Sequence, residues 1–250
     1  MVNHPPPQCL ANYPLGKKIP HTEADRTRPT SGFGSAKART KHDLRPPFMK
    51  ISSFTGGMAQ TNGYLLESTH GNLLIDAPDG IAAWLDSKGV RVDEILLTHQ
   101  HYDHVQDAAA LQQRGAKIHA HSTYSPDLTL ESAARAWGMP IEVEPYQIDS
   151  LIDPGAPLEI NSMQITTAHV PGHSTDSVTF YFAANSILFS GDTLFAGSIG
   201  RTDLPHGSTS QLLDGIRAHL FTLPPETIVL SGHGPQTTIG DEIADNPFLS

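Results

Sequence analysis

From residue 49 onward the chain alternates short apolar runs with turn residues, and this pattern predicts strands and helices in a regular order. The segments 50–54, 62–67 and 72–76 are apolar runs of strand length bounded by turn residues. The tetrapeptide Thr-His-Gly-Asn at 69–72 is typical of a hairpin turn between the second and third segments. The chain is therefore predicted to open with an antiparallel meander.

A helix, a strand and a second helix are expected after the meander. Asp79 is placed to cap the N-terminus of a helix that runs through Ser87 and ends at Gly89. A strand is predicted over 92–97, and a helix from about Asp103 to Arg114. Side chains on the first turn of that second helix would be held by a rigid element instead of a mobile loop.

The rest of the chain repeats this alternation. Its middle part predicts a strand at 117–120, a helix at 128–137 and a strand at 141–146. Its last part predicts strands at 158–160, 163–168, 178–183, 187–190 and 227–230, and a helix at 211–220. Two meanders, each followed by strand-helix units, favour a layered fold in which sheets are covered by helices.

Residues 1–48 have a different composition. They contain repeated prolines and eight Lys and Arg against three acidic residues, and they show neither helix nor strand periodicity. We expect an extension with little regular structure at 1–48 and a folded domain at 49–250. Four interpretations of the extension stay open: a tail, an organelle-targeting peptide, a strap on the domain, or translated sequence upstream of a true start at Met49.

Composition and charge narrow the classes of function. Residues 49–250 hold eight Lys and Arg against twenty-three acidic residues, so we expect no nucleic-acid partner, because phosphate binding rests on clustered basic side chains. No apolar run approaches the roughly 20 residues that span a bilayer, so we expect no membrane association and a cytoplasmic protein, with organelle targeting left open. The single cysteine, Cys9, excludes an intramolecular disulfide.

The chemistry concentrates in the segment Thr-His-Gln-His-Tyr-Asp-His at 98–104, directly after the apolar run at 95–97. In an extended chain alternate side chains share a face, so His99 and His101 can converge on one ion. Asp103 and His104 point elsewhere unless the chain turns, and a turn would direct them to a second ion. Imidazole suits zinc or iron, and a carboxylate leaves room for water in the coordination shell.

Three further candidate ligands stand beside glycine after apolar runs: His173 in Pro-Gly-His, Asp192 in Gly-Asp-Thr and His233 in Gly-His-Gly. Glycine permits tight turns and close backbone approach at such positions. In these elements the sequence resembles the metallo-β-lactamase superfamily, whose H-x-H-x-D-H motif and later His, Asp and His agree with it in type and order. The resemblance covers roughly residue 49 to the end.

The resemblance implies a four-layer αββα sandwich of the α/β (α+β) class, with metals at one edge between two sheets. It implies that His99, His101 and His173 hold a first divalent ion, that Asp103, His104 and His233 hold a second, and that Asp192 bridges both. Zinc is the expected metal, and iron or manganese also suits the ligands. A hydroxide shared by the two ions would be the nucleophile, and Asp103 would orient it and handle a proton.

Several other polar residues have less specific signals. Asp76, at the end of the predicted strand 72–76, either accepts a hydrogen bond from a ligand histidine or is a turn residue at a strand end. Tyr102 and Arg201 are candidates for substrate contact, although Arg201 and Asp203 equally suit a structural ion pair. Five other histidines of the domain are expected to be packing, supporting or surface residues: His70, His119, His121, His169 and His219. In the extension, His4, His21 and His42 are expected to be solvated.

The segments 190–203, 232–240 and 246–249 are similar to the glyoxalase II group, in particular to its short bacterial forms. That resemblance implies hydrolysis of a thioester of the S-lactoylglutathione type, with a small glutathione-derived molecule as substrate. Full-length members carry a C-terminal helical domain that contacts glutathione, and this chain stops soon after His233. We therefore expect weak glutathione affinity, a substitute for that domain, or another thioester or ester as substrate.

Other functions stay open on the same ligands. The first alternative is a persulfide dioxygenase with one iron held by His99, His173 and Asp192, and the second is a lactonase or esterase of the same fold. A metal-binding module without catalysis is a third. Hydrolysis of β-lactams is disfavoured, because that branch often has a cysteine at the position that Asp192 occupies here.

Overall fold

The computed structural model describes residues 49–139 and 141–250, so the predicted extension at 1–48 lies outside the described residues. Two six-stranded sheets dominate the described part of the chain, and a small hairpin lies beside them. Within these residues no helix combines the length and the apolar character needed to cross a bilayer.

The first sheet has the strand order β1-β2-β3-β4-β5-β6. Its antiparallel meander is the predicted one, and β3, β4, β5 and β6 then pair in parallel. Three helices lie in the connections from β3 to β4 and from β4 to β5, and a fourth lies in the segment between β5 and β6. The elements are β1 (Lys50–Gly56), β2 (Thr61–Ser68), β3 (Gly71–Ile75), α1 (Ile81–Lys88), β4 (Glu94–Leu96), α2 (Tyr102–Val105), α3 (Ala108–Gln113), β5 (Lys117–Ala120), α4 (Glu131–Ala136) and β6 (Ser150–Leu151).

The second sheet has the order β14-β13-β10-β9-β8-β7 and is built from the rest of the chain. Its strands are β7 (Leu158–Ile160), β8 (Met163–His169), β9 (Val178–Phe182), β10 (Ile187–Gly191), β13 (Ile228–Ser231) and β14 (Thr237–Thr238). The helical elements are η1 (Ala183–Asn185), α5 (Thr209–Gly215), the π-helical turn η2 (Ile216–Leu220) and α6 (Ile239–Asp245), and β11 (Leu194–Phe195) and β12 (Ser198–Ile199) form the separate hairpin.

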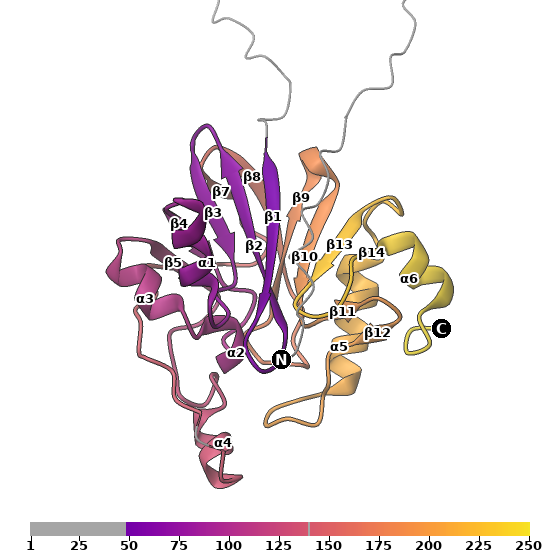
Figure 1. Ribbon diagram of the computed structural model, residues 1–250. Coiled ribbons are helices and arrows are strands. Elements are labelled where there is room, and N and C mark those ends of the chain that lie inside the picture. Colours follow the sequence, from indigo (N-terminus) through magenta and orange to yellow (C-terminus); the bar gives the residue numbers. More distant parts are fainter. Residues whose placement is uncertain (1–48, 140) are drawn as a thin grey trace, which may run out of the picture.

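The layers follow from the alternation of side chains along the strands. Leu65 and Leu74 point to the cluster under α1 and α3, whereas their neighbours Leu66 and Leu73 point to the cluster between the sheets. A third cluster joins the outer face of the second sheet to α5, η2 and α6. Helices thus cover the outer face of each sheet (Figure 1), and the four-layer αββα sandwich is confirmed.

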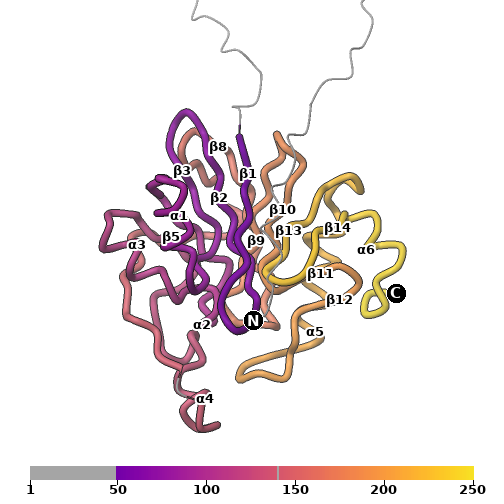
Figure 2. The backbone as a smooth tube through the Cα atoms, viewed as in Figure 1, coloured from indigo at the N-terminus to yellow at the C-terminus, as the bar shows by residue number. Residues whose placement is uncertain are grey.

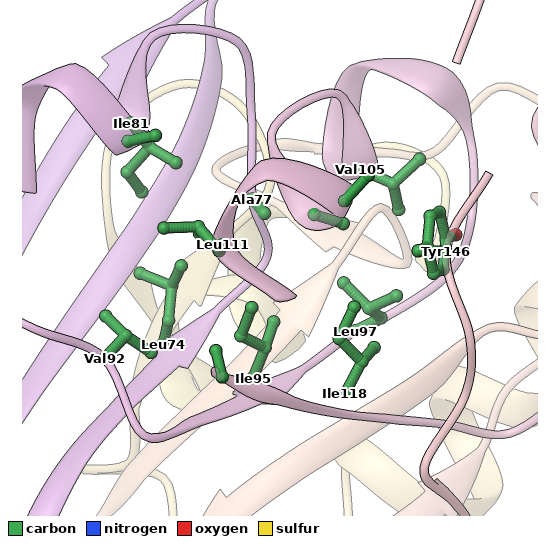
Figure 3. Packing of buried hydrophobic residues seen from close by; sticks show 14 of the residues in the cluster. Leu74, Ala77, Ile81, Val92, Ile95, Leu97, Val105, Leu111, Ile118 and Tyr146 are labelled. Atoms are coloured by element: carbon green, nitrogen blue, oxygen red, sulfur yellow. The ribbon is translucent and has the colours of Figure 1, made fainter. Parts of the chain in front are cut away.

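The two parts of the chain lie side by side, with the purple to magenta segments on one side and most of the orange to yellow segments on the other (Figure 2). The helix-covered face of the first sheet packs tightly: Leu74 and Ile95 of the sheet lie close to Leu111 of α3 (Figure 3). Burial of such aliphatic side chains contributes about 1.5–3 kcal/mol each.

The predicted cap of α1 is wrong. The N-cap is Gly80, with a φ of 90°, and no side chain caps it from within the segment. Instead, the carboxylate of Asp107 accepts a hydrogen bond from the backbone N–H of Ala82 at 2.8 Å. The predicted end at Gly89 is correct, because Gly89 adopts a left-handed conformation with a φ of 65°.

The predicted helix from Asp103 to Arg114 is divided into α2 and α3. The carbonyl of His104 accepts from the N–H of Ala77, and the N–H of Asp107 donates to the carbonyl of Ala77. These bonds to the β3–α1 connection replace the backbone bonds of a continuous helix at this point. The break leaves the Asp107 side chain free to reach α1.

The predicted strand at 141–146 is also wrong. Ile141, Val143 and Tyr146 are buried, which produced the alternating pattern, but the segment pairs with no strand of the described chain. The N–H of Val143 donates to the side chain of Glu131 instead. The strand at this edge of the sheet is the short β6, which pairs with β5.

Candidate metal centre

The predicted ligands follow β4, β8, β10 and β13 along the chain. Four loops carry His99, His101, His173, Asp192 and His233, and α2, at the end of the first loop, carries Asp103 and His104. Backbone hydrogen bonds hold these loops together. The N–H of Val178 donates to the carbonyl of Thr98 at 2.8 Å, and the N–H of Gly232 donates to the carbonyl of Gly191 at 2.8 Å. All four loops therefore converge at one edge of the sandwich, where strands from both sheets end.

All seven predicted ligands meet at this edge. Their nitrogen and carboxylate oxygen atoms form three groups in which every atom lies within 4.8 Å of the others: His99, His101 and His173; His99, His104 and Asp192; and Asp103, His104 and His233. The first and third groups are the two ligand sets implied by the resemblance. Asp192 lies in the group between them, as a bridging ligand would.

The Asp192 carboxylate faces three imidazoles. Its oxygens lie 3.3 Å from Nε2 of His104, 3.4 Å from Nε2 of His173 and 3.2 Å from Nε2 of His233. In a tetrahedral site with metal–nitrogen bonds of about 2.0–2.1 Å, neighbouring ligand atoms lie about 3.4 Å apart. The spacing of these atoms therefore suits ligands around shared ions.

Several of these atoms have no hydrogen-bond partner although they are buried. They are Nε2 of His99, Nε2 of His104, Nε2 of His173 and Oδ1 of Asp192. A buried polar atom without a partner costs about 1–3 kcal/mol, so four of them in one place indicate a missing ligand. Divalent cations at the two ligand sets would satisfy all four, and the residues present fit such ions.

In the rings of His173 and His99 the second nitrogen, Nδ1, has a hydrogen-bond partner. That partner determines which nitrogen carries the proton when the ring is neutral. Nδ1 of His173 lies 2.8 Å from the carbonyl oxygen of Arg201, which can only accept, so Nδ1 carries the proton. Thr98 Oγ1 donates its proton to Asp76, so it accepts from Nδ1 of His99 at 3.1 Å. Nε2 of both rings therefore presents a lone pair to the site.

The side chain of Asp76 supports the segment 98–104 through hydrogen bonds to two of its residues. Its carboxylate accepts from the N–H and the hydroxyl of Thr98, each at 2.8 Å, and lies 2.8 Å from Nδ1 of His104. It thus orients His104 directly and His99 through Thr98. Of the two interpretations left open by the sequence, this geometry favours the acceptor for a ligand histidine.

Two buried rings of the first group, those of His99 and His101, are neutral at pH 7. Burial lowers the pKa of His99 well below its usual range, and the neighbouring imidazoles of His104 and His101 lower it further. Burial lowers the pKa of His101 to about 3, and the neighbouring imidazole of His173 acts in the same direction. Both rings can therefore bind a cation without releasing a proton.

The carboxylate side of the site has the opposite tendency. Burial opposes a charge on His104, but the carboxylates of Asp192 and Asp103 hold its pKa well above the usual range. Burial likewise opposes a charge on His233, but hydrogen bonds to Asp103 and Asp192 raise its pKa to about 10. Burial would raise the pKa of Asp103, yet His104 and His233 lower it to about 2. Protons thus neutralise the carboxylates where a divalent cation otherwise would.

Gly232 is required by close packing. A Cβ atom at this position would lie 2.1 Å from Oδ1 of Asp192 and 2.7 Å from Cε1 of His104. The glycine beside His233 therefore serves close backbone approach, as its place in the sequence suggested. One side of the site is open, because the His233 side chain is 26% exposed and that of Asp103 is 13% exposed, whereas His104 is fully buried.

The two candidates for substrate contact lie at the periphery. Tyr102 opens α2, is half-buried and packs against the cluster under α1 and α3. Arg201 forms an exposed ion pair with Asp203 at 2.7 and 2.8 Å, while its carbonyl supports His173. The ion pair lies at the surface, and substrate contact by Tyr102 or Arg201 stays a prediction.

The five other histidines predicted to have supporting or surface roles lie outside the three ligand groups. Nε2 of His119 pairs with Glu94 at 2.7 Å, and the rings of His121 and His169 contact each other. His70 and His219 are exposed, as expected of surface residues.

Sequence reasoning overlooked two supporting residues. Thr61 of β2 donates a hydrogen bond to Oδ2 of Asp103 at 2.6 Å, and Thr98 joins Asp76 to His99. Thr98 could have been suspected from its place beside His99. Thr61 carries no local signal, because its partner lies 42 residues away.

Comparisons with known proteins agree with this geometry. Residues 56–233, which include all seven predicted ligands, match the family model of the metallo-beta-lactamase superfamily. YqgX of Bacillus subtilis (strain 168), a probable metallo-hydrolase, is 36% identical over 210 residues, covering 81% of this chain and 98% of the relative. GloC of Haemophilus influenzae, named a hydroxyacylglutathione hydrolase, is 34% identical over 199 residues, covering 76% of this chain and 93% of the relative.

Similar solved structures cover about the same part of the chain. BLEG-1, a B3 metallo-beta-lactamase, matches with a TM-score of 0.73 at 35% identity, over 80% of this chain and 99% of that one. TTHA1623, solved in a di-iron-bound form, matches with a TM-score of 0.68 at 39% identity, over 79% and 99%. ETHE1 from Myxococcus xanthus matches with a TM-score of 0.65 at 26% identity, over 80% and 84%.

Proposed function

The chain belongs to the metallo-β-lactamase superfamily, and on that premise we propose that this metallo-hydrolase cleaves thioesters of the S-lactoylglutathione type at a dinuclear centre. One observation carries the proposal. The seven side chains gather in two ligand sets with Asp192 between them, and Nε2 of His99, His104 and His173 and Oδ1 of Asp192 are buried without a hydrogen-bond partner. His99, His101 and His173 would hold one ion, Asp103, His104 and His233 the other, and Asp192 both.

Divalent ions at these positions would lower the pKa of water toward neutrality and polarise the substrate carbonyl. The protein's own groups supply the rest. Asp103 is ionised at pH 7, so it can accept a hydrogen bond from the attacking water and orient it. Thr61 holds that carboxylate in place through its hydroxyl. Asp103 and His233 also form the open side of the site, so substrate would approach there.

The thioester fits this site chemically. Addition of water oxygen to the carbonyl carbon and cleavage of the carbon–sulfur bond yield a carboxylate and a thiolate, and the two protons of the water pass to the solvent. A thiol has an ordinary pKa of about 8.5, so the sulfur leaves as an anion with little proton assistance. The likeness to GloC supports a hydroxyacylglutathione as the substrate class.

Two similar structures widen the range of metals and substrates to be tested. TTHA1623 was solved with two irons bound, which supports iron as a candidate metal beside zinc and manganese. The likeness to BLEG-1 brings β-lactams, which the sequence disfavoured, into the range of substrates to assay. Arg201 is the basic side chain on the loop that supports His173, and we propose it and Tyr102 as contacts for the substrate.

The test pairs elemental analysis with turnover of S-lactoylglutathione, a lactone, a β-lactam and glutathione persulfide on one preparation. Two ions per chain with thioester turnover is the expected result. Asp192→Ala should lower thioester turnover to the uncatalysed rate, whereas Asp86→Ala, in an exposed ion pair with Arg114 on the outer helices, should leave it unchanged.

Three results would overturn the proposal. Full activity of a folded Asp192→Ala protein would exclude the bridging role of Asp192. Preferential turnover of the lactone or the β-lactam would replace the thioester as substrate. A single iron with sulfite production from the persulfide would instead assign the oxygenase chemistry at His99, His173 and Asp192.

A further inference from the structure

Gln100 occupies the variable position between two predicted ligands, and its side chain points away from the metal site. Strand-like alternation turns the Gln100 side chain to the opposite face from His99 and His101, and it is fully inaccessible to solvent there. There its Nε2 lies 3.2 Å from Oδ2 of Asp176, and its Oε1 accepts from the hydroxyl of Tyr146 at 2.9 Å. The amide also donates to the carbonyl of Ser122 at 3.0 Å.

Asp176 belongs to the loop that carries His173. It is buried, and its other oxygen accepts a hydrogen bond from Ser174, the residue after His173. The Gln100 side chain therefore links the loop of His99 and His101, from the first sheet, to the loop of His173, from the second. These are the two loops that make up the first ligand group.

A second buried amide makes the corresponding link for the other ligand group. Asn62 on β2 donates through Nδ2 to the carbonyls of Ser231 at 3.1 Å and Gly234 at 3.0 Å, on either side of His233. Its Oδ1 accepts from the hydroxyl of Thr55 at 2.7 Å. Asn62 thus ties the first sheet to the loop that supplies the second-sheet ligand of the second group.

We propose that Gln100 and Asn62 are positioning residues that each set the geometry of one metal subsite: Gln100 that of His99, His101 and His173, and Asn62 that of Asp103, His104 and His233. The physical reason lies in how the halves are joined. Each subsite takes ligands from both sheets, and the apolar contacts between the sheets are not directional. A hydrogen-bonded amide is directional, so it determines the distance between ligands that the apolar packing leaves adjustable. This inference rests on the dinuclear centre proposed above.

A purely structural role would affect both subsites alike, so the test measures the two subsites separately. His233→Ala should leave a protein that binds one zinc at the first subsite, and His101→Ala one that binds zinc at the second. Into each we would introduce Gln100→Met or Asn62→Leu, which keep the approximate volume and remove the hydrogen bonds. Zinc affinity is then measured by competition with a chromophoric chelator.

Gln100→Met should weaken zinc binding about 10- to 100-fold in the His233→Ala protein and leave it unchanged in the His101→Ala protein. Asn62→Leu should give the reverse. Thr167→Val is the matched control, because it replaces a buried hydroxyl without a partner in the middle of β8 and should change neither affinity.

Equal losses in both backgrounds, or no loss in either, would overturn the inference. If Gln100→Met or Asn62→Leu does not fold, Tyr146→Phe and Thr55→Val remove only the hydroxyls that donate to Gln100 and Asn62, and the same selectivity should appear with a smaller loss. Wild-type protein that binds fewer than two ions would instead contradict the proposed dinuclear centre, so the two failures are distinguishable.

Discussion

Asp76 has a backbone conformation that few residues other than glycine adopt. Its φ is 58°, directly after β3, and its N–H donates to the carbonyl of Leu96. Asparagine and aspartate tolerate this region better than other side chains, but the conformation still costs free energy. The conformation persists because the buried carboxylate gains three hydrogen bonds, two from Thr98 and one from His104.

Asp76→Ala should destabilise the protein and weaken metal binding together. Two donors on Thr98 and one on His104 would lose their buried acceptor, so we expect a loss of about 2–4 kcal/mol in the free energy of unfolding. The ion at His104 should bind about 10- to 100-fold more weakly. Urea unfolding and chelator competition measure the two effects.

Asp79→Ala is the control. Asp79 is three residues from Asp76, and its carboxylate is exposed. We expect its effect on unfolding to stay within about 0.5 kcal/mol. Unchanged stability and metal affinity in Asp76→Ala would show that the ring of His104 needs no carboxylate behind it.

At the scale of elements, α1 depends on a residue that lies outside it. Its N-cap is a glycine in a left-handed conformation, and the free N–H of Ala82 is satisfied by Asp107 between α2 and α3. Burial raises the pKa of Asp107, while the hydrogen bond from Ala82 opposes that rise. The carboxylate connects the outer helix to the segment that follows the metal motif.

Asp107→Ala should therefore cost as much as the loss of an N-cap. We expect the free energy of unfolding to fall by about 1 kcal/mol, because one N–H at the start of α1 loses its acceptor. Thermal and urea unfolding would measure this change. The exposed Asp79, which the sequence had suggested as the cap, should be replaceable by alanine at almost no cost, and the opposite ranking would contradict the structural assignment.

At the scale of the whole molecule, the metal centre couples stability to pH. In the metal-free protein His99 and His101 remain neutral in the fold to low pH, whereas in the unfolded chain they take up protons near pH 6.5. The unfolded state then binds more protons, so stability falls as the pH drops below about 6.5. For His104 and His233 the folded pKa is raised, so their contribution is complete below about pH 6.5 and is lost as the pH rises toward about 10.

We expect the chelator-treated protein to be most stable near pH 6.5 and to lose stability on both sides. Loading with zinc should raise stability at neutral pH by about 2.7 kcal/mol at a free zinc concentration of 100 times the dissociation constant. Urea unfolding between pH 4 and pH 10, with and without zinc, measures both effects. A flat profile of the metal-free protein would contradict the assigned protonation of the four histidines.

Much of this architecture is determined by the sequence itself. Leu65 and Leu66 point to opposite faces of the first sheet, as do Leu73 and Leu74, because successive residues of a strand alternate. Adjacent leucines within a strand therefore require that both faces of the sheet be covered. The alternation in His-Gln-His likewise directs two imidazoles to one side. Such local periodicities are read without knowledge of distant contacts, so most of the elements could be predicted in order. The ligand set of seven came from the His-x-His-x-Asp-His motif, from the three residues beside glycine, and from the family resemblance of these segments.

The tertiary structure alone decided which distant groups support those ligands. Asp76 reaches His104 across 28 residues, Gln100 reaches Asp176 across 76, and Asn62 reaches Ser231 across 169. The misassigned elements have the same origin, because Glu131 accepts from a backbone N–H that a strand would have paired, and Asp107 caps a helix far from it in sequence. Local propensity carries no information on such bonds, since they form only when the packing of the two halves brings donor and acceptor together.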